Sequence, residues 1–248
     1  MTTLSVIIPI HNDSEQFLKN YKPFLEHLST IKGLTDYEVV IGDNGSTERD
    51  RRLVEKACSG EPAIRYFYTP VKGIGSGMKL GLANAHNQMF FIYSVDFPFG
   101  FKIIDESLAA YAGKKGDTLV LGSKRHASSK TNIPLKRRVL SFFYNGLISI
   151  VYGLGVKDTQ GTMLLSKGMY ADIGPHLSAD SAFMQAQLCI YAAAHGYFLE
   201  EIPVEYMVYR PGSKINPLKD SIRMFKDVLG EYKKYMEVKK SLRTRAKH

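Results

Sequence analysis

The sequence predicts an α/β protein built on a mostly parallel sheet. Short apolar runs recur along its first half, helical segments separate them, and 248 residues with 44% hydrophobic content can form one sizeable core. Alternating strands and helices favour right-handed crossovers between parallel strands. We therefore expect the carboxyl ends of the strands to meet at one edge, where open α/β sheets bind their ligands.

The first strand is expected over residues 4–9, a near-continuous apolar run closed by a proline, and the next two over residues 39–42 and 64–68. A helix over residues 14–31 separates the first two. The second strand stops at an Asp-Asn-Gly sequence, and a helix is expected to start there with Ser46 or Thr47 as N-cap.

Asp43 stands at the carboxyl end of that second strand. An Asp-Asn-Gly sequence is by itself a turn former. At this position, however, Asp43 is also a carboxylate at the edge where ligands bind. From these residues alone, both interpretations stay open.

A glycine-rich stretch follows the third strand, with Gly73, Gly75 and Gly77 at alternate positions opening a helix. Backbone N–H groups at such a start can approach a phosphate or a ribose. The spacing does not match a Walker loop, so the glycines alone are weak evidence.

Two further strand ends carry charged residues. The strand over residues 89–93 leads to Asp96, and the strand over residues 118–122 leads to Lys124 and Arg125. Acidic and basic groups that converge beside a glycine-rich helix start suit a nucleotide diphosphate and a cation.

The segment over residues 130–157 has a different character, since residues 139–156 contain no charged side chain. This run nearly reaches the length of a transmembrane helix. Polar residues and glycines interrupt it, and basic residues flank only its N-terminal side. A helix in the membrane interface, or packed on the domain, is therefore favoured over a span, with a buried core helix as the open alternative.

The C-terminal part is expected to contain strands over residues 163–166 and 198–204, a helix over residues 183–195 and an amphipathic helix over residues 218–246. Residues 210–248 hold 12 Lys or Arg against 4 Asp or Glu, a net charge of +8 out of +9 for the chain. Such a localised charge suggests lipid headgroups or nucleic acid as partner, or a merely solvated helix. Two cysteines make no metal or disulfide framework, and no signal peptide is expected.

Taken in order, these motifs resemble family 2 glycosyltransferases with the GT-A fold, and more narrowly the polyprenyl-phosphate (dolichyl-phosphate) mannosyl- and glucosyltransferases. The resemblance covers roughly residues 4–227. It is carried by residues 5–12, 40–47, 73–81, 95–96, 121–124, 158–161 and 210–214. It implies a catalytic domain over residues 1–214, which includes the interfacial segment, and a basic amphipathic helix over residues 215–248.

The resemblance implies a nucleotide site around Pro9, Asn12, Asp43 and Val95, with Asp43 accepting hydrogen bonds from the base. Gly75 would face the ribose and the diphosphate.

The family's Asp-any-Asp motif falls on residues 94–96 and keeps only Asp96, because position 94 is Ser. Asp96 is thus the implied ligand of Mg²⁺ or Mn²⁺, with reduced affinity. Pro98 stands where the family often has Gln.

The family's acidic base would fall near Gln185 or Gln187, and neither amide can take a proton. A phosphate acceptor needs no general base, so the missing carboxylate favours a lipid phosphate acceptor. Transfer to a glycan hydroxyl, or a nucleotide-sugar-binding relative that has lost activity, are the alternatives.

The implied reaction is an inverting transfer of mannose or glucose from a GDP- or UDP-sugar to polyprenyl phosphate. Besides Asp96, the implied catalytic residues are Arg138, Arg210 and Lys214, because basic side chains bind phosphates. Lys124 and Arg125 would stabilise the leaving diphosphate. A surface ion pair is the alternative for each basic residue.

The expected partners are the nucleotide sugar, the polyprenyl phosphate, a membrane surface and a separate membrane subunit. Nucleic acid is not expected, since no nucleic-acid motif accompanies the basic tail. The expected location is peripheral, on the cytoplasmic side of a membrane.

Overall fold

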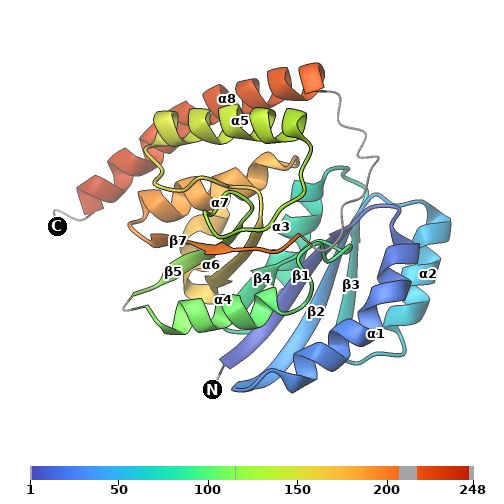
Figure 1. The fold of residues 1–248 in the computed structure, drawn as a ribbon. Coiled ribbons are helices and arrows are strands. Elements are labelled where there is room, and N and C mark those ends of the chain that lie inside the picture. Colours follow the sequence, from blue (N-terminus) through green and yellow to red (C-terminus); the bar gives the residue numbers. More distant parts are fainter. Residues whose placement is uncertain (1, 115, 207–216, 246–248) are drawn as a thin grey trace.

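The computed structural model describes residues 2–114, 116–206 and 217–245, and contains a seven-stranded sheet with the order β3-β2-β1-β4-β6-β5-β7 (Figure 1). Among the described strands, only β6 runs antiparallel to its neighbours. The predicted class, α/β with a mostly parallel sheet, is confirmed. The strands are β1 (Thr2–Ile10), β2 (Leu34–Asn44), β3 (Ile64–Thr69), β4 (Met89–Ile92), β5 (Thr118–Ser123), β6 (Thr162–Ser166) and β7 (Phe198–Pro203).

Helices cover both faces of the sheet. One face carries α1 (Ser14–Thr30), α2 (Glu48–Cys58) and α4 (Ile103–Ala112), and the other carries α3 (Ile74–Asn84), α6 (Lys167–Ile173) and α7 (Phe183–Ala194). A short 3₁₀ helix, η1 (Gly174–His176), follows α6. Neighbouring residues of β1, such as Ile7 and Ile8, belong to different core clusters, because successive side chains of a strand point to opposite faces. Burial on both faces explains why β4 and most of β1 are apolar runs.

The first half of the chain follows the predicted order of strands and helices. Thr47 is the N-cap of α2, and its side chain accepts a hydrogen bond from the Asp50 N–H. The strand β2 differs from the prediction, since it begins at Leu34 and ends at Asn44, so that Asp43 still belongs to the strand. The helices α4 and α6 have no counterpart among the predicted elements.

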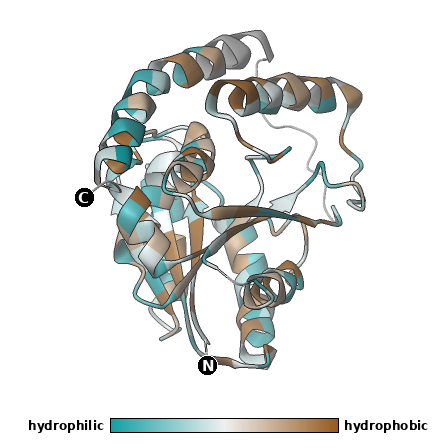
Figure 2. Cartoon of the chain, turned by 90° about the vertical axis from the view of Figure 1, so that its left-hand side faces the viewer, coloured by the Kyte–Doolittle hydropathy of each residue, from teal (hydrophilic) through white to brown (hydrophobic). Residues whose placement is uncertain are grey.

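Two helices lie side by side at one end of the molecule, outside α7: α5 (Leu135–Tyr152) and α8 (Pro217–Arg245) (Figures 1 and 2). The inner side of α5 buries Tyr144, Ile148 and Tyr152, and the Tyr152 hydroxyl donates to the Val228 carbonyl of α8. Its outer side is exposed, with Phe143 at 68% and Ile150 at 84% exposure. The uncharged segment is therefore half-buried and is not a core helix.

The neighbouring helix α8 carries four further exposed apolar residues at helical spacing: Phe225, Leu229, Tyr232 and Met236. Among the described residues, no helix is both long and apolar enough to cross a bilayer.

Candidate functional site

The candidate site lies at the carboxyl ends of the parallel strands. β1, β2, β4 and β5 end at this edge of the sheet. Pro9, Asp43, Ser94 and Lys124 are therefore all at the same edge. Because β6 runs in the opposite direction, it begins at this edge with Thr162. The direction of β6 is not visible in the sequence, and residues 160–162 are site residues that the sequence-based prediction missed.

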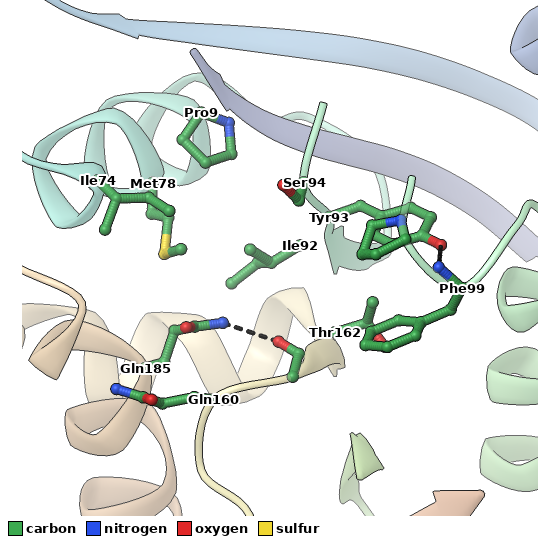
Figure 3. Close-up of a pocket in the computed structure, with 12 residues that line it drawn as sticks. Pro9, Ile74, Met78, Ile92, Tyr93, Ser94, Phe99, Gln160, Thr162 and Gln185 are labelled. Atoms are coloured by element: carbon green, nitrogen blue, oxygen red, sulfur yellow. Dashed lines mark hydrogen bonds between the residues drawn. The ribbon is translucent and has the colours of Figure 1, made fainter. Parts of the chain in front are cut away.

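A pocket of about 130 Å³ opens between these strand ends and the helices α3 and α7 (Figure 3). None of its lining residues is charged. The Thr162 hydroxyl is buried and has no hydrogen-bond partner among the described residues, and Gln185 Nε2 donates to the Gly161 carbonyl at 2.7 Å. Apolar walls with a few hydroxyl and amide groups suit an uncharged, hydroxyl-bearing ligand. The lining residues are Pro9, Ile74, Met78, Ile92, Tyr93, Ser94, Pro98, Phe99, Gln160, Gly161, Thr162 and Gln185.

Asp43 and Asn12 hold the turn between β2 and α2. Asp43 is fully buried, and its carboxylate accepts hydrogen bonds from the Ser46 N–H at 2.9 Å and the Tyr66 hydroxyl at 2.6 Å. The Asn12 side chain accepts from the Thr47 N–H at 2.7 Å, across the start of α2. Burial, and then Asp43, raise the pKa of Tyr66, so that this hydroxyl stays a donor. Asp43 and Asn12, two of the five residues predicted to bind the nucleotide, thus have structural contacts, and neither lines the pocket.

Gly75 lies against the loop before α7 and does not line the pocket. Its N–H donates to the Asp180 carbonyl at 2.9 Å, and a Cβ there would stand 2.5 Å from the carbonyl oxygens of Ala179 and Ser181. The Asp180 carboxylate accepts from Lys79 Nζ at 2.8 Å, and this bond is the largest cause that lowers the Asp180 pKa. The glycine at this position therefore permits the close approach of two protein segments.

Residues 94–96 leave β4 beside the pocket. Ser94 lines the pocket and its hydroxyl donates to Asp96, which is half-buried. The Val95 carbonyl accepts from Asn20 Nδ2 at 3.3 Å, which ties this turn to α1. Phe97 adopts a φ of 43°, a conformation that few non-glycine residues adopt, so the turn after Asp96 is sharply bent.

The donor set at Asp96 fits a cation that is shared with a substrate. Among the described residues, no group of three or more His, Cys, Asp or Glu side chains could hold a metal ion. Mg²⁺ commonly binds through one or two carboxylates together with substrate phosphates and water. One carboxylate beside the Ser94 hydroxyl meets that minimum.

Lys124 and Arg125, the predicted diphosphate ligands, differ in their contacts. The Lys124 ammonium lies 3.3 Å from the buried Asp158 carboxylate and also donates to the Gln160 carbonyl. The Arg125 guanidinium lies 4.7 Å from the centroid of the Phe142 ring on α5, and its Nη1 is buried without a hydrogen-bond partner among the described residues. Lys124 is thus already neutralised, whereas Arg125 retains donor capacity.

The two glutamines near the family's base position have separate roles. Gln185 lines the pocket, whereas the buried Gln187 accepts from the N–H groups of Ser178 and Ala179 and so holds the loop before α7. Arg138 is exposed on the first turn of α5. The remaining two predicted site residues, Arg210 and Lys214, lie outside the described residues.

Comparison with known proteins gives a family match and curated relatives. The family model described as Glycosyl transferase family 2 matches residues 5–174. Dolichyl-phosphate beta-glucosyltransferase of Saccharomyces cerevisiae is 22% identical over 245 residues, covering 91% of this chain and 73% of the relative. The enzyme with the same name from Dictyostelium discoideum is 24% identical, with 91% and 72% covered. Dolichol-phosphate mannosyltransferase of Pyrococcus furiosus is 26% identical, but covers 56% of this chain and 38% of the relative.

Solved structures share the fold. Glucosyl-3-phosphoglycerate synthase from Mycobacterium tuberculosis with UDP has a TM-score of 0.68 at 14% identity, covering 93% of this chain and 80% of the synthase. The same synthase with Mn²⁺, UDP and phosphoglyceric acid has a TM-score of 0.67 at 15% identity, with 93% and 78% covered. The expected GT-A arrangement of sheet and helices is confirmed.

Proposed function

The chain belongs to glycosyl transferase family 2, and on that premise we propose that this glycosyltransferase moves a hexose from a nucleotide-diphosphate sugar to a polyprenyl phosphate. The observation that supports a phosphate acceptor is the neutral pocket, because Gln185 lines it and none of its twelve lining residues is a carboxylate. A hydroxyl acceptor must lose a proton as it attacks, which needs a base. A phosphate oxygen is already anionic at neutral pH.

In this proposal, the acceptor oxygen attacks the anomeric carbon of the sugar as the bond from that carbon to the diphosphate oxygen breaks, with inversion. The nucleoside diphosphate leaves with the electron pair. Asp96 would hold a divalent cation that neutralises the leaving charge when it is bound. Arg125 and Arg138, together with Arg210 and Lys214, would bind the phosphates.

The pocket lined by Thr162, Gln160 and Gln185 would receive the sugar, because hydroxyls and amides can hydrogen-bond to a hexose. Asp43, Asn12, Pro9 and Val95 would surround the nucleotide. Glucose is the first hexose to test, because the matches to glucosyltransferases cover 91% of this chain and the match to the mannosyltransferase covers 56%.

The test is an assay with radiolabelled UDP-glucose or GDP-mannose, polyprenyl phosphate and Mg²⁺ or Mn²⁺. Label that moves into the organic phase supports the proposal and identifies the sugar. Label that appears only in a water-soluble glycan, or that stays on every donor, contradicts it.

The exposed face of α5 and α8 is further proposed to dock on an anionic membrane surface. We expect the protein to sediment with phosphatidylserine vesicles at moderate salt. The double variant Phe143→Ser, Ile150→Ser should lose about ten-fold or more of its affinity for these vesicles, because it loses two exposed apolar side chains. The matched control is Phe198→Ser, since Phe198 is 67% exposed and belongs to neither helix but to the start of β7, beside the start of β5. Equal binding by the double variant and the control would contradict this orientation.

A further inference from the structure

One polar residue of α5, Asn145, is buried against the loop that faces the pocket. Asn145 is 2% exposed and Thr159 is fully buried. Asn145 Oδ1 accepts two hydrogen bonds from Thr159, one from its N–H and one from its hydroxyl, both at 2.9 Å. Asn145 Nδ2 donates to the Ser141 carbonyl at 2.9 Å, which fixes the orientation of the amide on the helix.

Thr159 stands next to residues 160–162, all of which line the pocket (Figure 3). The loop is also held on its other sides: Asp158 is paired with Lys124, and the Gly161 backbone packs so closely on Gly122 that a Cβ would stand 1.9 Å from the Gly122 carbonyl oxygen. Asn145 thus ties this loop to α5 by two buried hydrogen bonds. Its loss would leave a buried N–H and a buried hydroxyl without their acceptor, which displaces the loop or costs stability.

The opposite side of α5 carries the exposed apolar side chains, and α8 lies beside it with exposed Phe225, Leu229, Tyr232 and Met236. Three exposed lysines recur at seven-residue spacing next to this apolar stripe of α8: Lys226, Lys233 and Lys240. An apolar stripe flanked by basic side chains is complementary to an anionic bilayer surface. One helix therefore connects that surface to the pocket.

We propose that Asn145 is a positioning residue that couples α5 to the loop of residues 158–162, so that docking of α5 on an anionic lipid surface tightens binding of the donor's sugar. This inference rests on the proposed function, in which the pocket receives the sugar and α5 faces lipid. By reciprocity, a bound sugar would tighten docking by the same factor.

The first test compares the affinity for a nucleotide with the affinity for its sugar conjugate by calorimetric titration. The pair is UDP and UDP-glucose, or GDP and GDP-mannose if GDP-mannose is the donor that supports transfer. Asn145→Leu removes the acceptor and keeps the side-chain size. We expect its affinity for the nucleotide sugar to fall about ten-fold and its affinity for the free nucleotide to stay unchanged, because only the sugar contacts the displaced loop. Equal weakening of both ligands, or no change in either, overturns the positioning role.

Two further variants accompany this test. Thr159→Val keeps the N–H and removes the hydroxyl donor, so its affinity for the nucleotide sugar should fall about three-fold while its affinity for the free nucleotide stays unchanged. This variant replaces Asn145→Leu in the test if Asn145→Leu does not fold. The matched control is Ser149→Ala, which removes a 3.0 Å hydrogen bond from α5 to the Val156 carbonyl, outside the pocket loop. It should bind both ligands as the wild type does, and sugar-selective weakening in this control overturns the assignment to Asn145.

The second test adds phosphatidylcholine–phosphatidylserine vesicles without polyprenyl phosphate. We expect the vesicles to tighten nucleotide-sugar binding about five-fold in the wild type and in Ser149→Ala, and not in Asn145→Leu. If the wild type transfers hexose to polyprenyl phosphate but the vesicles leave its donor affinity unchanged, the coupling is wrong and the proposed function stands. Absence of transfer from every donor would instead contradict the proposed function.

Discussion

Asp96→Asn is expected to lower transfer at least a hundred-fold at any Mg²⁺ concentration. Asparagine keeps the size of the side chain and an acceptor for the Ser94 hydroxyl, but loses the one carboxylate of residues 94–96. The charge that develops on the leaving diphosphate would then lack its cation. The measurement is the initial rate of transfer to polyprenyl phosphate over a range of Mg²⁺ concentrations.

The matched variant is Ser94→Asp, which adds a second carboxylate on the pocket side of Asp96. It should lower the Mg²⁺ concentration needed for half-maximal rate by about ten-fold, because a second anionic oxygen ligand strengthens binding of a hard cation. A wild-type rate in Asp96→Asn would show that this carboxylate has no part in transfer.

Gly161→Ala is expected to lower the free energy of unfolding by about 3 kcal/mol and to weaken nucleotide-sugar binding. The added Cβ would stand 1.9 Å from the Gly122 carbonyl oxygen, and this neighbour is backbone that cannot rotate away. The loop of residues 160–162 and the carboxyl end of β5 would therefore be pushed apart. Urea unfolding and donor titration measure the two effects.

Gly146→Ala is the control for that change. Gly146 lies within α5, and apart from the adjacent backbone of that helix a Cβ there would meet no atom of the described residues within 4 Å. Alanine should stabilise the helix by about 1 kcal/mol. A midpoint for Gly161→Ala at or above that of the wild type would contradict the close packing of residues 161 and 122.

The first half of the fold was predictable because β1 and β2 each contain a buried apolar run that is followed by a turn and a helix. The helix α4 was missed although Ile103, Ile104 and Leu108 follow helical spacing, so its signal was present in the sequence. The helix α6 spans only seven residues, which is too short for a 3.6-residue repeat to be distinctive. The reversed direction of β6 depends on which strands it pairs with, and a local pattern does not carry that information.

The edge that carries the candidate site was predictable, since it follows from strand direction alone. The contacts within it were not. Asp43 accepts a hydrogen bond from Tyr66 of the neighbouring strand, and the Gly75 N–H donates to Asp180, which lies in a loop 105 positions later. Lys124 forms an ion pair with Asp158. Such partners are distant in sequence and are joined only by tertiary packing. The motif at residues 158–161, one of those that carry the family resemblance, marked the pocket loop in the sequence. None of these four residues was predicted as a site residue.

The central claim is that the acceptor is a phosphate, which needs no catalytic base. It is tested most directly by offering polyprenyl phosphate and the corresponding polyprenol, which differ only in the anionic group, with the same labelled donor. Label should enter the organic phase with polyprenyl phosphate and stay at background with polyprenol. Equal transfer to both would mean that the protein activates a hydroxyl, and would contradict the account.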